Sequence, residues 1–202
     1  MRQTFLRGWG QISGTSRYIG ECPSGEAHLI GSKAVVFDVE VAKCLFEVGF
    51  FGKPLGVKKP KKYDLGRPLE LSLVEAYYLQ QKGVLAIVKD GVKLSQLEFE
   101  GLCEKLIPDF KELYEVYKEL RDLGFVVRSA LKYGSDFAIY RKAPGLEHAP
   151  YLVKVLKYDQ VIDPGDLIGW GRLSHSVRKD LLLAILLPSG LKNYVLFKWF
   201  KP

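Results

Sequence analysis

The chain has 202 residues, 48% of them hydrophobic, and its 30 Lys and Arg against 23 Asp and Glu give a net charge of +7. This composition is typical of a globular protein of one domain or two small ones. The longest apolar run, residues 181–187, is too short to span a bilayer, and the N-terminal MRQTFLRGWGQ lacks the apolar core of a signal peptide. We therefore expect a cytoplasmic protein without a membrane partner. Its positive charge favours RNA or DNA as partner.

The numbers of cysteine and asparagine residues indicate further what kind of protein this is. Cys22, Cys44 and Cys103 are odd in number, widely spaced and without a CxxC pair. This pattern indicates neither a disulfide framework nor a zinc site, so we predict buried thiols, no metal and no cofactor. Asn193 is the only asparagine, which is typical of proteins from thermophiles.

Residues 1–107 predict a small mixed α/β domain. Strands are expected at residues 5–12, 27–30, 34–37 and 84–88, and a helix at 38–48 with Asp38 as its N-cap. Two further helices should begin at the capping boxes Ser72-x-x-Glu75 and Ser95-x-x-Glu98.

The run KPLGVKKPKK at residues 53–62 is strongly basic. It has two readings, a solvated loop or a flexible arm that grips RNA phosphates. Its lysines are Lys53, Lys58, Lys59, Lys61 and Lys62, and Arg67 follows.

A second domain is expected at residues 108–202, after a boundary near Pro108. It should open with an amphipathic helix at 109–123 that ends at Gly124. Alternation in residues 136–141 predicts a strand with Tyr140 on its less apolar face. A loop with Pro and Gly then leads to a strand at 151–157, which predicts an antiparallel hairpin with His148 opposite Tyr140.

The next unit is a strand, helix and strand crossover, so its two strands should be parallel. Lys179 enters the second of these strands and should lie at the sheet end that carries His148. Tyr140, His148 and Lys179 then meet at one rim. A base, an acid and a cation are what a phosphodiester attacked by its own 2′-hydroxyl requires, without a metal. A tyrosine of pKa about 10 would need a neighbouring cation such as Lys179 to act as the base.

Three motifs carry a resemblance: YGSDFAIY, the histidine in LEHAPYLV, and RLSHSVRK before an apolar strand. They closely resemble the catalytic domain of archaeal tRNA-splicing endonucleases over residues 108–202. FEVGFFGKPLG and LSLVEAYYLQQKG extend a weaker resemblance over residues 1–107. The resemblance implies an α+β chain whose C-terminal domain is a restriction-endonuclease-like nuclease with a central mixed sheet. It also implies Tyr140 as general base, His148 as general acid and Lys179 as transition-state stabiliser.

The same resemblance implies a substrate and its contacts. The substrate would be precursor tRNA, cut at bulge-helix-bulge junctions to leave a 2′,3′-cyclic phosphate and a 5′-hydroxyl. Arg172 would stack on a bulged base, with Trp199 as its candidate partner; a core role for Trp199 is equally open. His175 is the competing histidine, and its place at a helix end favours a structural role.

The resemblance also implies assembly. Asp159, Asp163 and Asp166 form an acidic loop of the kind that binds a neighbouring subunit, and the last strand, residues 194–200, is apolar on both faces. We expect a heterotetramer with a structural subunit, with a homotetramer or homodimer as alternatives. Two other classes are alternatives that the sequence disfavours. A metal-dependent nuclease would use Asp109-Phe110-Lys111, but this motif opens a predicted helix and has no convergent carboxylate. A non-catalytic RNA-binding structural subunit is disfavoured by the complete set of Tyr140, His148 and Lys179.

Overall fold

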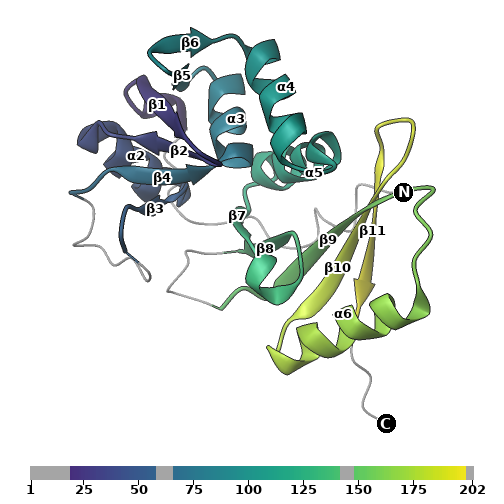
Figure 1. Ribbon diagram of the computed structural model, residues 1–202. Helices are drawn as coiled ribbons and strands as arrows, with labels where there is room; N and C mark the ends of the chain where they lie inside the picture. The colour runs from purple at the N-terminus through teal and green to yellow at the C-terminus, as the bar shows by residue number, and fades with distance from the viewer. Residues whose placement is uncertain (1–18, 58–65, 142–147, 199–202) are drawn as a thin grey trace. The chain divides into compact units, whose positions relative to one another are not determined.

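The computed structural model describes residues 19–57, 66–141 and 148–198 (Figure 1). These residues form a mixed α+β chain with two mixed sheets, in two compact units divided between Lys111 and Glu112. The strand expected at residues 5–12 lies outside the described residues. None of the helices that the structure describes combines the length and the apolar character of a membrane span.

The unit from residue 19 to 111 contains a sheet of order β3-β4-β2-β1-β5-β6. Only β1 and β5 pair in parallel. The strands are β1 (Gly25–Ile30), β2 (Lys33–Val36), β3 (Lys53–Pro54), β4 (Leu69–Ser72), β5 (Leu85–Lys89) and β6 (Val92–Leu94). The helices are η1 (Ile19–Glu21), α2 (Val39–Gly49), α3 (Leu73–Gln81) and α4 (Gln96–Leu106).

Side-chain caps start these helices where the sequence predicts. The Asp38 carboxylate accepts hydrogen bonds from the backbone N–H of Glu40 and Val41 at 2.9 and 3.1 Å. Both expected capping boxes, at the starts of α3 and α4, are present. These caps satisfy backbone N–H groups that have no partner within their helix.

The prediction of three buried thiols is wrong for two of the cysteines. Cys22, after η1, and Cys44, in α2, form a disulfide with their Cα atoms 5.7 Å apart. Their spacing of 22 residues carries no motif, and the pairing arises only because α2 folds back beside the chain that precedes β1. Cys103 is free and buried, as predicted.

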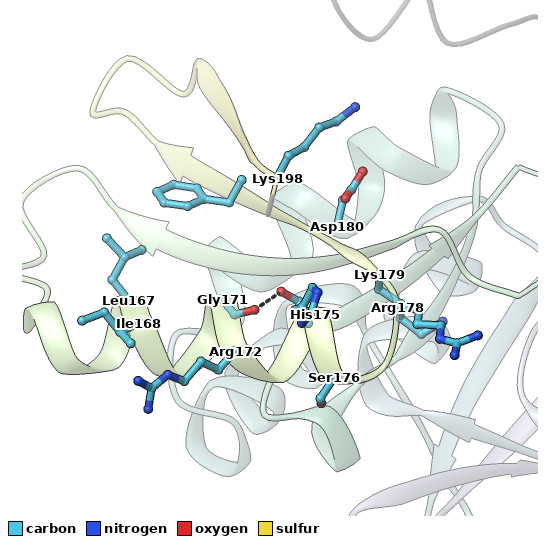
Figure 2. A pocket seen from close by; sticks show the side chains of 12 residues that line it. Leu167, Ile168, Gly171, Arg172, His175, Ser176, Arg178, Lys179, Asp180 and Lys198 are labelled. Carbon is cyan, nitrogen blue, oxygen red and sulfur yellow. Dashed lines mark hydrogen bonds between the residues drawn. The ribbon is translucent and has the colours of Figure 1, made fainter. Parts of the chain in front are cut away.

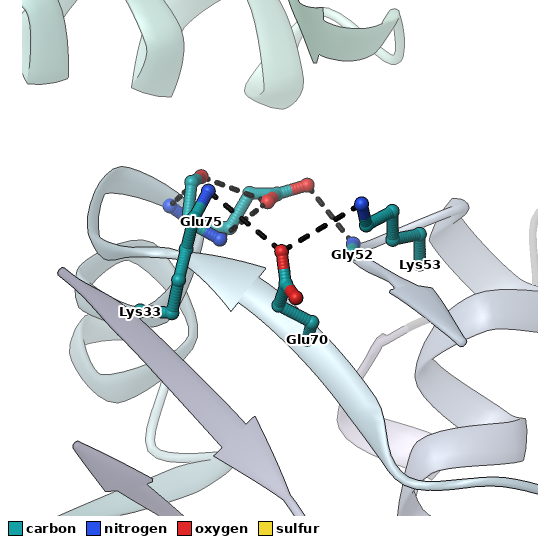
Figure 3. A network of polar contacts seen from close by, with 6 residues as sticks. Lys33, Gly52, Lys53, Glu70 and Glu75 are labelled. Carbon is teal, nitrogen blue, oxygen red and sulfur yellow. Dashed lines mark hydrogen bonds and ion pairs between the residues drawn. The ribbon is translucent and has the colours of Figure 1, made fainter. Parts of the chain in front are cut away.

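A buried carboxylate joins the start of α3 to the turn before β3 (Figure 3). Glu75 accepts hydrogen bonds from Ser72 N–H at 2.9 Å and from Gly52 N–H at 3.0 Å. Gly52 has φ of 57°, and a Cβ there would lie 2.5 Å from the Glu70 carbonyl oxygen, so only glycine fits. Lys53 begins β3 and therefore belongs to the sheet and not to a loop. Its Nζ lies 3.8 Å from Oε1 of Glu70 in β4.

The other unit is built on a sheet of order β11-β10-β9-β8-β7. As predicted, β8 and β9 form an antiparallel hairpin, and β9 and β10 are parallel and joined through α6. The strands are β7 (Val126–Ser129), β8 (Phe137–Tyr140), β9 (Tyr151–Lys157), β10 (Asp180–Leu186) and β11 (Lys192–Phe197). The helices are α5 (Phe110–Asp122), η3 (Leu131–Tyr133) and α6 (Pro164–Ser176).

Alternate residues of β8 serve the two faces of this sheet. Ala138 belongs to an apolar cluster with Leu152 of β9 and Leu181 of β10, against which Leu167 of α6 packs. Phe137 points to the other face, where its ring lies 5.7 Å from that of Tyr117 in α5. Both faces of β8 are therefore covered, although the sequence predicts that one is less apolar.

Candidate functional site

The candidate site lies at one end of the C-terminal sheet. β8 ends at Tyr140, while β9 begins at Tyr151 and β10 at Asp180. Because β8 is antiparallel to β9 and β9 is parallel to β10, the end of β8 and the starts of the other two strands share one edge. The structure thus brings Tyr140, the segment before β9 and Lys179 to the same rim.

The strand register corrects the expected position of His148. Ile139 and Asp180 both pair with Tyr151, so continuing the register by one residue sets Pro150 beside Tyr140 and Lys179. Asp180 N–H donates to the Pro150 carbonyl at 3.0 Å, which continues this pairing. His148 lies two residues before Pro150 and is not opposite Tyr140, because the β8–β9 ladder stops at Ile139. It is exposed at the same edge.

Lys179 is held in place by two bonds. Its side-chain Nζ donates to the carbonyl of Ala149 at 2.7 Å, and its backbone N–H donates to the carbonyl of Ser174 at 2.9 Å. Ala149 is buried and directly follows His148, so the half-buried ammonium group is anchored beside the histidine. An ammonium carries three donors, and among the described residues the Ala149 carbonyl takes one of them, which leaves two for other acceptors.

Tyr140 is half-buried at the end of β8, where it packs against the apolar cluster of Ala138 and Leu152. Its neighbours Phe137, Ala138 and Ile139 are all buried. Tyr140 is therefore the first residue of this strand that is partly exposed, and it lies at the rim where the strand ends.

A pocket of ≈ 940 Å³ extends from Lys179 along α6 to the end of β11 (Figure 2). It has basic groups and an apolar wall that includes Ile168 and Phe197. Such a surface suits an anion joined to a flat apolar group, as in a nucleotide. Its cationic residues are Arg172, Arg178, Lys179 and Lys198, beside one carboxylate, Asp180.

Three sequence-predicted positions bear on this pocket. Arg172 lines it, whereas its expected partner Trp199 lies outside the described residues. His175, interpreted from sequence as structural, is exposed in the last turn of α6 and lines the same pocket. His175 follows Arg172 by three residues, and residues with this spacing share a helix face. The sequence could therefore have indicated that His175 lies in the same site as Arg172.

The acidic residues lie at the start of α6. Asp159, Asp163 and Asp166 are all exposed. Asp163 is also the N-cap of α6 and accepts a hydrogen bond from Gly165 N–H at 2.7 Å. This role is not among the roles predicted for Asp163 from the sequence, although the order Asp-Pro-Gly is typical of a capping residue followed by Pro at the first helical position.

The other residues that the sequence predicts to contact RNA or a metal do not line this pocket in the described part of the chain. Lys58, Lys59, Lys61 and Lys62 lie outside the described residues, and Lys53 is in β3. The alternative motif Asp109-Phe110-Lys111 is at the start of α5, while metal-dependent nucleases of that class carry theirs on adjacent strands.

Comparison with known proteins accounts for both units. Residues 25–100 match the N-terminal domain of tRNA intron endonucleases, and residues 110–194 match their catalytic C-terminal domain. A tRNA-splicing endonuclease of Hyperthermus butylicus is 50% identical over 178 residues, which cover 87% of this chain and 98% of the relative. Similar proteins of the same name in Sulfolobus acidocaldarius and Saccharolobus islandicus are 45% identical, with the same coverage. The chain therefore belongs to the tRNA intron endonuclease family.

Proposed function

We propose that this chain is the catalytic subunit of a tRNA-splicing endonuclease, which cuts precursor tRNA at bulge-helix-bulge junctions without a metal ion. Membership of the tRNA intron endonuclease family supports precursor tRNA as the substrate. The bond from Lys179 Nζ to the Ala149 carbonyl supports a catalytic role, because it fixes a cation beside His148 at the rim that Tyr140 also reaches.

In the proposed reaction a 2′-hydroxyl attacks the adjacent phosphorus. Tyr140 in its phenolate form accepts the proton of this hydroxyl while the bond from the 2′-oxygen to phosphorus forms. The bond from phosphorus to the 5′-oxygen breaks, and His148 donates a proton to the leaving oxygen. Lys179 neutralises charge on the non-bridging oxygens. The products are a 2′,3′-cyclic phosphate and a 5′-hydroxyl, and no water is consumed.

RNA bulges suit this reaction because their backbone can reach the in-line geometry that a regular helix denies. We propose that Arg172 and Trp199 stack on a bulged base. Contacts by the lysines of residues 53–62 with RNA phosphates are also proposed. The ion pair of Lys53 with Glu70 makes Lys53 the least available of these.

We further propose a heterotetramer with a structural subunit, with a homotetramer or homodimer as alternatives. The edge strand β11 supports assembly, because Val195 and Phe197 are 41% and 37% exposed there. Asp159, Asp163 and Asp166 are the proposed docking groups. The Cys22–Cys44 disulfide fits a heat-tolerant cytoplasmic enzyme, since intracellular proteins of hyperthermophiles are rich in disulfides.

The test is cleavage of a precursor tRNA in the presence of a chelator, by the chain alone and with a candidate structural subunit. We expect spliceable halves whose 3′ ends carry a cyclic phosphate. A chain that binds this RNA and never cleaves it, with or without partner, would be a structural subunit. Activity that the chelator abolishes would instead favour the metal-dependent class.

A further inference from the structure

Arg178 occupies an unusual backbone conformation directly before Lys179. Its φ is 55°, in the left-handed region, at the position just after the C-cap Val177 of α6. Its N–H donates to the His175 carbonyl at 3.0 Å, and the next N–H donates to the Ser174 carbonyl at 2.9 Å. This ending of the helix strongly favours glycine, which pays no Cβ penalty for a positive φ.

Three other non-glycine residues in the described part of the chain have a positive φ, and each differs from Arg178 in residue type or in side-chain contacts. Asp90 and Asp109 belong to a residue type that tolerates positive φ. Phe50 ends α2, and its ring contacts that of Phe46 at 5.9 Å. Arg178 is exposed, and within the described part of the chain its side chain forms no hydrogen bond or ion pair. The left-handed backbone at Arg178 ends α6, but the contacts of the described residues give no structural reason for an arginine there in place of glycine.

The surroundings of Arg178 indicate a ligand. Its side chain lines the pocket together with Lys179 and points away from Arg172, so the two guanidinium groups extend in opposite directions (Figure 2). A ligand that bridges both must be extended and anionic. A strand of RNA with its regularly spaced phosphates fits this requirement.

We infer that Arg178 is a positioning residue that binds a phosphate of the RNA backbone on the side of Lys179 away from Arg172. Position 178 is an arginine although glycine would be more stable there. The reason in this proposal is that the planar guanidinium donates two hydrogen bonds to a phosphate next to the reacting one. A residue held in strain at a functional site is a recurring feature of binding sites. The inference rests on the proposed function, since it assumes RNA in this pocket.

The experiment compares Arg178→Gly and Arg178→Lys in the assembled enzyme. The RNA is precursor tRNA with 2′-deoxynucleotides at both junctions, so that binding is measured without cleavage. The slope of log affinity against log salt is negative, and losing one phosphate contact should make it shallower by ~0.7 to 0.9. The affinity deficit against the wild type should therefore be roughly sixfold larger at ~0.1 M salt than at ~1 M salt. Arg178→Gly should nevertheless raise Tm by about 2 °C or more, because the strain is relieved. Arg178→Lys keeps the charge and the strain, so its salt slope and Tm should stay near those of the wild type.

The control is Lys105→Ala, which removes the same charge from α4 in the other unit. Its salt slope should match that of the wild type. If Arg178→Gly binds RNA with unchanged affinity and salt slope, or if its Tm falls, the inference is wrong. Failure of the wild-type enzyme to cleave unmodified precursor tRNA would instead overturn the proposed function.

Discussion

At the scale of single residues, the two histidines of the C-terminal unit, His148 and His175, are both exposed. His148 precedes the Ala149 carbonyl that anchors Lys179, while His175 lies in the last turn of α6. We expect His148→Ala to slow single-turnover cleavage by about 10² to 10⁴, the usual contribution of a general acid, with RNA binding retained. His175→Ala, as the matched variant, should leave the chemical step near the wild-type rate. The reverse result would exchange the roles of the two histidines.

Lys179 offers a test of geometry as well as of charge. A guanidinium is planar and longer than an ammonium, so Lys179→Arg cannot keep the 2.7 Å bond to the Ala149 carbonyl and still meet the same phosphoryl oxygen. We expect Lys179→Arg to be slower than the wild type and Lys179→Met slower still, in single-turnover rates at saturating enzyme. Equal rates for all three would remove Lys179 from the site.

At the scale of elements, the Cys22–Cys44 disulfide ties η1 to α2. Thiol titration should find one reactive thiol in the unfolded, unreduced chain and three after reduction. None should react in the folded chain, because burial raises the pKa of Cys103 to about 12 and so suppresses its thiolate. Three thiols without reductant would show that the disulfide is absent.

The same disulfide should contribute about 3 kcal/mol to the free energy of unfolding, since it closes a loop across 22 residues. Reductant should therefore lower the urea midpoint of the wild type and leave that of Cys44→Ser unchanged. Cys103→Ser is the control, and it should keep its response to reductant. The raised pKa of Cys103 also predicts that stability falls as pH rises from about 9 towards 12, because only the unfolded chain releases the thiol proton there.

At the scale of the whole molecule, the acidic residues beside α6 must be tested without breaking the helix. Reversing the charge of Asp163 would also remove the N-cap that binds Gly165 N–H. Asparagine caps as well as aspartate, so the triple change of Asp159, Asp163 and Asp166 to Asn removes the charges and keeps the cap. We expect this variant to dissociate the assembly and lose cleavage, with native mass as the measurement.

Asp163→Ala is the counterpart of that variant. It should cost about 1 kcal/mol of stability through the lost cap, while two acidic groups remain to hold the assembly. If the triple asparagine variant stays assembled and active, docking through this loop is wrong.

The sequence by itself determined the features that depend on residues close together in the chain, such as the starts of helices and the connections between strands. Caps at Asp38, Ser72 and Ser95 begin three helices because their side chains bond to N–H groups two or three residues away. The hairpin and the parallel crossover followed from alternation and connection length, and they put Tyr140, His148 and Lys179 at one sheet end. The family could also be recognised from contiguous motifs.

Only the tertiary structure decided what depends on residues far apart in the chain. The Cys22–Cys44 disulfide, the register that sets Pro150 beside Tyr140, and the pocket that joins α6 to Phe197 all need long-range pairing. The left-handed backbone of Arg178 also depends on the tertiary structure. A sequence motif gives the order of the side chains, whereas packing of α6 against the sheet fixes the residue at which the helix must end. Local patterns therefore gave the elements and the candidate triad, and the folded sheet gave their spacing.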